Sequence, residues 1–156
     1  MTKPPRELLK AADIEATEAT VKVHALNPNA VRHRKSLGDA TGLTQFGFHR
    51  IELMPGHDSS EYHRHLYEEE CVYVLSGAGS ALIDDCAYPI DAGDFLGFAR
   101  NGPAHVVTNT GNEPLVLLVA GQRLEHDVCD YPHRGLRLYI NGEQEDFVDF
   151  GAIQSG

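Results

Sequence analysis

Long apolar runs and paired cysteines are both scarce in this sequence. No stretch approaches the roughly 20 apolar residues that a membrane-spanning helix needs, and the first ten residues hold no apolar segment of signal-peptide length. The three cysteines, Cys71, Cys86 and Cys129, are far apart and form no Cys-x-x-Cys pair, which argues against a disulfide framework and a zinc ribbon. We therefore expect a cytoplasmic protein without a membrane partner.

Positive charge is low as well. The chain has 13 Lys plus Arg against 23 Asp plus Glu, a formal net charge of −10, and such a field repels phosphate backbones. No nucleic-acid partner is expected. Lysine is confined to Lys3, Lys10, Lys22 and Lys35, so any later cation must be an arginine. Arginine favours bidentate contacts with carboxylates or phosphates over catalysis by an amine, and Arg50 is one candidate.

What the sequence does contain is a series of short β-rich runs between turn residues. Its 156 residues and 42% hydrophobic content suit one domain with a packed core. Residues 7–19 are helix-tolerant, and beyond them Gly, Pro, Asn and Asp separate apolar runs at the spacing of an all-β sandwich or barrel. The expected strands are 20–26, 45–54, 61–65, 70–76, 80–83, 87–90, 95–98, 105–108, 115–120 and 137–140.

A cluster of potential metal ligands lies between residues 56 and 70. Residues two apart on a strand face the same way, so His63 and His65 present two imidazoles together while Arg64 faces away. Glu70 opens the next apolar run and His105 opens another. Three imidazoles and one carboxylate would suit a divalent first-row metal. Considered singly, His105 would be an ordinary strand histidine and the run 68–70 a solvated acidic face.

This segment resembles the first cupin motif, G-x5-H-x-H-x3/4-E-x6-G, at Gly56, His63, His65, Glu70 and Gly77, with one extra residue after Gly56. Glu69 is the chief rival to Glu70, because an interval of three residues after His65 also fits the pattern. Glu70 is preferred because Gly77 then follows at the required spacing.

The second cupin motif, G-x5-P-x-G-x2-H-x3-N, is matched more loosely by Gly93, His105 and Asn109. Ala99 and Asn101 stand where the motif has Pro and Gly, and the interval from Gly93 to His105 is one residue longer. The turn residues 101–103 would supply the reversal in a shifted position.

The resemblance implies an all-β fold, a double-stranded β-helix or cupin jelly-roll barrel over residues 44–121. Residues 1–43 would be an N-terminal arm, partly helical or extended, and residues 122–156 a C-terminal extension that packs on the barrel or on a partner. The family's metal ligands carry over to His63, His65, Glu70 and His105, with Zn, Mn, Fe or Ni as the divalent ion. A homodimer is also implied.

The chain is similar to stand-alone bacterial cupins labelled as sugar-phosphate isomerases. The first hypothesis is therefore a metal-dependent enzyme of the isomerase type that acts on a small oxygenated metabolite, and dioxygenase, decarboxylase and lyase chemistry stay open. His49, His57 and Arg50 are candidate catalytic residues, the histidines as proton carriers. Two alternatives stay open. The chain could be a non-catalytic cupin that binds or senses a small molecule, or the metal could have a purely structural role and only stabilise the fold. His126 and His133 form a separate cluster with no assigned role.

Overall fold

A computed structural model describes residues 3–156 of the chain. Burial alternates along its central strands from one residue to the next. In β5 (Glu70–Ser76), Val72 and Val74 are buried whereas Tyr73 and Leu75 are exposed, because successive side chains on a strand point to opposite faces. One face of the strand therefore belongs to a core and the other to the surface.

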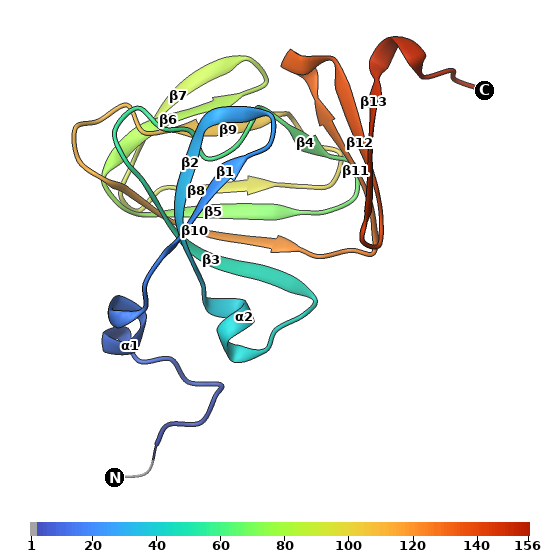
Figure 1. Cartoon of the computed structure of the whole chain (residues 1–156). Coiled ribbons are helices and arrows are strands. Elements are labelled where there is room, and N and C mark those ends of the chain that lie inside the picture. Colours follow the sequence, from blue (N-terminus) through green and yellow to red (C-terminus); the bar gives the residue numbers. More distant parts are fainter. Residues whose placement is uncertain (1–2) are drawn as a thin grey trace.

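Six antiparallel strands form the largest sheet, in the order β1-β2-β3-β10-β5-β8. A smaller antiparallel sheet, β7-β6-β9, lies across the barrel from it (Figure 1). The strands of the large sheet are β1 (Thr20–His24), β2 (Asn27–Ser36), β3 (Phe46–Leu53), β5, β8 (Phe95–Phe98) and β10 (Leu115–Gln122), and those of the small sheet are β6 (Ala78–Ile83), β7 (Cys86–Asp91) and β9 (His105–Thr108).

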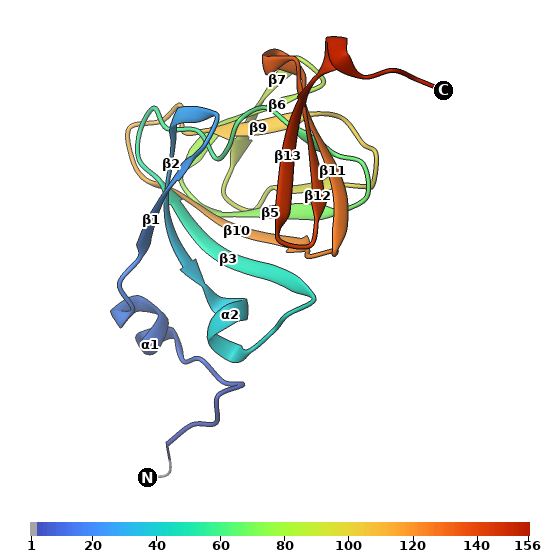
Figure 2. The same cartoon turned by 45° about the vertical axis from the view of Figure 1, so that its right-hand side comes forward.

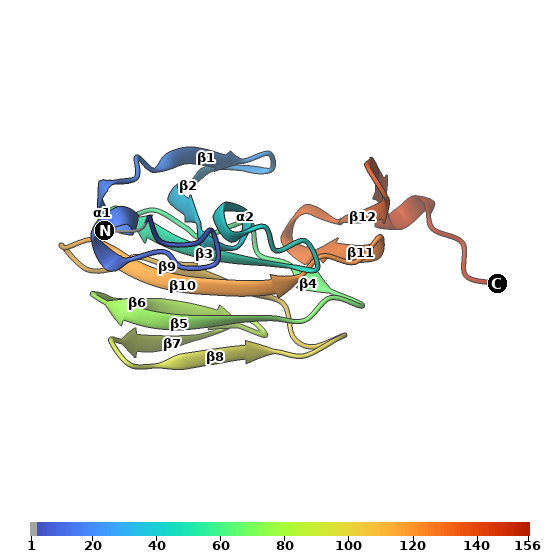
Figure 3. The ribbon, with the colours of Figure 1, turned by 90° about the horizontal axis from the view of Figure 1, so that it is seen from below.

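A third sheet, β13-β12-β11-β4, closes one end of the barrel (Figure 2). It joins the short strand β4 (Arg64–His65) to the C-terminal strands β11 (His126–Tyr131), β12 (Leu136–Asn141) and β13 (Gln144–Asp149). The remaining elements are the helices α1 (Ala11–Ala16) and α2 (Leu37–Thr41) and the single turns Pro132–Arg134 and Phe150–Ala152. Seen from below, α1 lies near one end of the barrel and the C-terminal strands lie at the other (Figure 3).

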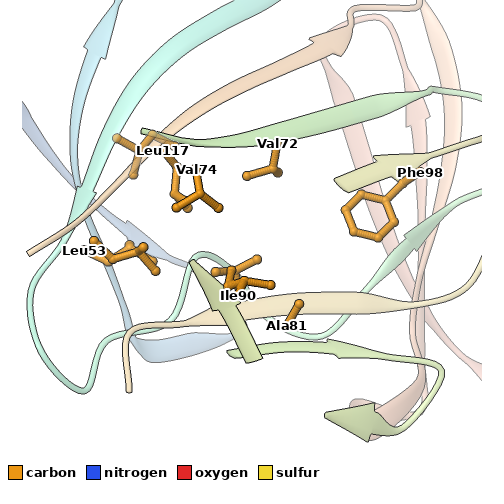
Figure 4. Packing of buried hydrophobic residues seen from close by; sticks show 10 residues of the cluster. Leu53, Val72, Val74, Ala81, Ile90, Phe98 and Leu117 are labelled. Atoms are coloured by element: carbon orange, nitrogen blue, oxygen red, sulfur yellow. The ribbon is translucent and has the colours of Figure 1, made fainter. Parts of the chain in front are cut away.

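The main core fills the barrel between the six-stranded sheet and the three-stranded sheet β7-β6-β9. Leu53, Val74 and Leu117 lie together at one end of this cluster, and Phe98 lies at the other (Figure 4). Its ten buried members are Ile51, Leu53, Val72, Val74, Ala81, Ile90, Phe98, Val107, Leu115 and Leu117. Burial of such apolar area, at about 25 cal/mol per Å², is the main force that holds the barrel closed.

The turn after β5 needs a glycine. Gly77 has a φ of 86°, a left-handed conformation that side chains rarely adopt, and a Cβ there would lie 2.5 Å from the Pro114 carbonyl oxygen. The strands β5 and β6 therefore depend on this residue for their connection.

The expected all-β jelly roll is confirmed, and the strands 70–76, 95–98 and 105–108 have the expected bounds. Three strands were not expected: β2, β11 and β13. Each is rich in polar and charged residues, so none gives the apolar signal of a strand.

The N-terminal 43 residues are more than an arm, because β1 and β2 extend the large sheet and β2 pairs with β3. Likewise, the C-terminal extension contributes a sheet that pairs with β4 inside the barrel region. Within residues 3–156, no helix is long and apolar enough to cross a membrane.

Candidate metal centre

Strand pairing fixes the positions of His63 and His65. The backbones of His63 and His105 exchange two hydrogen bonds, with N···O distances of 3.2 and 2.8 Å, and His65 pairs with Cys129 of β11. The intervening Arg64 turns away toward Asp130, at 3.5 Å. The two imidazoles therefore enter the barrel side by side, with ring centroids 5.0 Å apart.

Glu70, the first residue of β5, faces these imidazoles. One carboxylate oxygen, Oε1, lies 3.4 Å from His63 Nε2 and contacts His105 Nε2, and the other, Oε2, lies 4.0 Å from His65 Nε2. The ring of His105 is held flat against Phe98, with centroids 3.4 Å apart. The structure thus brings together all four residues that were predicted from the sequence as metal ligands.

Each of the three imidazoles is oriented by a hydrogen bond from its Nδ1. The acceptor is the Glu61 carbonyl for His63 (2.8 Å), the Asp127 carboxylate for His65 (2.7 Å) and the Pro103 carbonyl for His105 (3.2 Å). Carbonyl and carboxylate oxygens only accept, so Nδ1 carries the proton and a neutral ring has its lone pair on Nε2. All three Nε2 atoms face Glu70.

This donor set fits a divalent metal. Three nitrogen lone pairs and a carboxylate repel one another unless positive charge lies among them, either a proton on an imidazole or a cation. Nitrogen and oxygen donors of this kind suit Zn, Mn, Fe and Ni, and hydrogen-bonded Nδ1 atoms are typical of ligating histidines. Burial tends to raise the pKa of Glu70, but contacts with His105 and His63 hold it well below its usual value.

Asp127 supports the cluster from the C-terminal sheet. Its buried carboxylate binds His65 Nδ1 through Oδ2 and accepts the backbone N–H groups of Tyr67 and Glu68 through Oδ1, at 3.1 and 3.3 Å. Burial lowers the pKa of His65, but the hydrogen bond to Asp127 and the charge of Glu70 outweigh it and raise the pKa overall.

A second group of potential ligand atoms, from His65, Glu68 and Asp127, also lies within 4.8 Å of one another. Because Nδ1 of His65 is already bound to Asp127, this group acts as a support for the first cluster. Asp127 was not predicted from the sequence. The alternation of Asp127, Cys129 and Tyr131 places these residues on one face of a strand, but it does not show that this face lines a site.

A cavity of about 330 Å³ lies directly beside the cluster. Its walls are mostly apolar, and its polar members outside the cluster include His24, Arg32 and Tyr131. A second cavity of about 240 Å³ shares Arg32, His65 and Glu70 with the first, and we call it the mouth. The mouth is lined by Arg32, Arg34, Gly47, His49, Ile51, His65, Glu68, Glu69, Glu70, Val119, Gly121, Gln122 and Arg123.

The candidate catalytic residues lie in different places. His49 lines the mouth, where burial lowers its pKa and the nearby Arg34 and Arg123 charges lower it further. Among residues 3–156, those that line the cavity or its mouth include neither Arg50 nor His57. Arg50 faces the other side of β3 and pairs with Glu52 at 2.9 Å, because neighbouring strand residues alternate between faces.

The remaining candidates face away from the cluster. The carboxylate of Glu69, the rival ligand, accepts the backbone N–H of Arg100 at 3.1 Å. His133 lies 2.7 Å from Asp85 and stacks on Tyr62, with ring centroids 4.1 Å apart. His126 begins β11, one residue before Asp127.

Comparisons with known proteins agree with this arrangement. Residues 49–121 match the family model described as "Cupin domain". A crystal structure from Acidithiobacillus ferrooxidans, titled "Putative sugar phosphate isomerase", is 50% identical, aligns over 97% of both chains and has a TM-score of 0.96. One from Silicibacter pomeroyi, titled "sugar phosphate isomerase from a cupin superfamily", is 28% identical over 96% of both chains, with a TM-score of 0.80.

A Methanocaldococcus jannaschii protein with the name "Uncharacterized protein" is 29% identical over 80 residues, which cover 51% of this chain and 56% of that protein. The chain thus spans just over half the length of this curated relative. The domain match and the two structures show that the chain belongs to the cupin superfamily.

Proposed function

We propose that this chain is a metal-dependent enzyme that acts on a small oxygenated metabolite, and that its reaction is the isomerisation of a sugar phosphate. The observation that carries the proposal is the convergence of three Nε2 atoms on Glu70 at the wall of a cavity of about 330 Å³. The names of two relatives that align over nearly their whole length support the choice of reaction.

His63, His65, Glu70 and His105 would hold the metal. Such an ion acts as a Lewis acid that polarises the oxygens of a bound carbonyl or hydroxyl group. Asp127 keeps His65 in the tautomer that leaves Nε2 free, and the carbonyl of Glu61 does the same for His63. These supports hold the cluster in place before the substrate arrives.

The apolar walls of the cavity would exclude water from the reacting atoms. Val72 and Val119 are opposite each other on β5 and β10, and both line the cavity with Leu117 and Val107. In such surroundings electrostatic interactions are stronger than in water. A small polar substrate would therefore be oriented mainly by the cluster and by the few polar groups around it.

In the proposed reaction, His49 carries the proton. An isomerase moves a proton between neighbouring carbons, so it needs a group that is unprotonated at neutral pH. Because its pKa is lowered by burial and by the arginines around the mouth, His49 is a neutral imidazole at pH 7. It lines the mouth together with His65 and Glu70, next to the place where the substrate would lie.

The test uses the full chain loaded with Mn, Fe, Ni or Zn and a panel of aldose and ketose phosphates in D2O. Proton NMR should show interconversion of one pair, with solvent deuterium entering the neighbouring carbon that receives the proton. We expect His49→Gln to lower kcat by about 10²–10⁴-fold, while Arg50→Gln, on the opposite face of β3, keeps full activity. A metal-replete protein that is inert toward the whole panel would contradict the proposal.

The binding alternative predicts a different result in the same experiment. A metabolite of the panel would raise the melting temperature of the protein and would be recovered unchanged after long incubation. That outcome would favour a binding or sensing role over an enzymatic one.

A further inference from the structure

Arg32 and Arg34 face the interior of the barrel from the same side of β2. They are two residues apart on a strand, so their side chains share a face. Arg34 is opposite Ile51 of β3, which belongs to the core, so this face points inward. Both arginines line the mouth, and Arg32 also lines the cavity beside His63, His65, Glu70 and His105.

These two guanidinium groups differ from most other arginines of the chain in having no carboxylate partner. Within residues 3–156, neither Arg32 nor Arg34 forms an ion pair, and the buried Nε of Arg32 has no hydrogen-bond partner at all. By contrast, Arg50, Arg64, Arg123, Arg134 and Arg137 each pair with an Asp or Glu.

Leaving these cations without partners has an energetic cost. Burial lowers the pKa of Arg32, and the neighbouring charge of Arg34 lowers it further. A half-buried guanidinium without a counter-ion loses hydration that nothing in the protein replaces. Two such groups side by side therefore indicate a place where an anion from outside the chain binds.

We propose that Arg32 and Arg34 bind the phosphoryl group of a phosphate monoester whose other end lies at the Glu70 cluster. This inference rests on the proposed function and adds the residues that would select its substrate class. A monoester phosphate has three terminal oxygens and a charge near −2, which two guanidinium forks match. A carboxylate, with one charge and two oxygens, satisfies a single fork.

The acidic side chains of the mouth do not oppose this assignment. Glu68 accepts the backbone N–H of Leu124 at 2.9 Å, and Glu69 accepts that of Arg100 at 3.1 Å. Glu70 faces the histidines.

His49, on the neighbouring strand β3, and Arg123 also line the mouth near the two arginines, and Arg123 is held by Asp39 at 2.7 Å. The mouth therefore has a cationic side formed by β2 and an acidic side formed by the segment 68–70. A substrate with one anionic end would enter with that end toward β2.

Inorganic phosphate is the probe that tests this assignment. Its dissociation constant is measured by isothermal titration calorimetry with the metal-loaded full chain, in parallel with acetate, and bound metal is measured by elemental analysis. We expect Arg32→Gln and Arg34→Gln each to weaken phosphate binding by at least about tenfold, the loss of one charge-assisted contact. Both variants should keep the full metal content.

Arg50→Gln is the matched control, because Arg50 lies on strand β3 with its side chain outside the mouth. It should change neither phosphate binding nor metal content. A second readout separates a binding role from a structural one. Removal of an unpaired half-buried charge should leave the melting temperature of Arg32→Gln equal to or above that of the unmodified protein, and phosphate should no longer raise it.

The outcomes are distinguishable from failure of the proposed function. Unchanged phosphate affinity in both arginine variants, with metal retained, would overturn the inference and leave the metal centre intact. Acetate that binds as tightly as phosphate, with the same dependence on the two arginines, would also overturn it. If the unmodified protein turned over none of the sugar phosphates but still bound phosphate through the two arginines, only the proposed isomerase activity would be contradicted.

Discussion

Asp127 accepts a 2.7 Å hydrogen bond from Nδ1 of His65, a residue 62 positions earlier in the chain. The contact crosses from β11 to β4, which are neighbours in the sheet at the end of the barrel. The C-terminal segment is therefore part of the candidate metal centre.

Replacement of Asp127 by asparagine should weaken metal binding by about 10–100-fold. Asp127 accepts hydrogen bonds on both oxygens, whereas the NH2 group of an asparagine would face a donor, either His65 Nδ1 or the N–H groups of Tyr67 and Glu68. The dissociation constant is measured by competition with a chromophoric chelator.

Asp130→Asn is the control for this change. Asp130 lies on the same strand and is also buried, but its carboxylate binds Arg137 at 2.6 and 3.0 Å. It should lower stability and leave metal affinity unchanged. Equal metal affinity in Asp127→Asn and the unmodified chain would show that the contact with His65 is only structural.

Asn109 should be among the most sensitive polar positions for stability. Its fully buried amide donates to the carbonyls of Leu53 and Glu113, both at 2.8 Å, and accepts the N–H of Gly111 at 2.9 Å. Asn109→Ala leaves these backbone groups without partners, so urea denaturation should show a loss of about 3 kcal/mol. Asn112→Ala, at an exposed position of the same loop, should cost less than about 0.5 kcal/mol; similar losses at both positions would refute this account.

Cys129 should be chemically inert in the folded protein, although it lines the cavity. Burial raises the pKa of its thiol to about 12, so at pH 8 the reactive thiolate is scarce. Iodoacetamide at pH 8 should label the exposed Cys86 and spare Cys129, and mass spectrometry after unfolding in urea should find both labelled. Rapid labelling of Cys129 in the folded chain would contradict this prediction and would open a thiol-based mechanism.

The expected homodimer stays a prediction, and the outer face of the large sheet offers a surface for it. Tyr73 and Phe95 are opposite each other on β5 and β8, with 42% and 65% of their surface exposed. Light scattering should give twice the chain mass of 17.1 kDa, and Phe95→Glu should reduce it to one chain. Tyr88→Glu, an exposed aromatic position on β7, should have no effect. A monomeric unmodified protein at tens of micromolar would contradict the expectation.

The sequence predicted the strands and ligands whose signals are local. The continuous β-rich run 71–75 defined β5, and the spacing of His63, His65 and Glu70 needed only one strand and one turn. The polar strands gave no such signal. Arg32 and Asp127 are hydrophilic residues on inward faces, and nothing in their own segments shows that the neighbouring face belongs to a cavity.

The same physical reason explains both omissions. Strand register between distant segments is decided by pairing across the sheet, here Arg34 with Ile51 and Cys129 with His65. Polar residues on inward faces break the apolar pattern of a strand, and they do so where a site needs charge and hydrogen bonds.

Metal analysis of the purified chain tests most directly whether the three imidazoles and Glu70 bind one ion. After loading with Mn, Fe, Ni or Zn and extensive dialysis, plasma mass spectrometry should find about one ion per chain in the unmodified protein. Glu70→Gln with His105→Gln should lose it, and Glu52→Gln should keep it. A dialysed unmodified protein without bound metal, or a doubly substituted protein with as much metal as the unmodified one, would contradict the account.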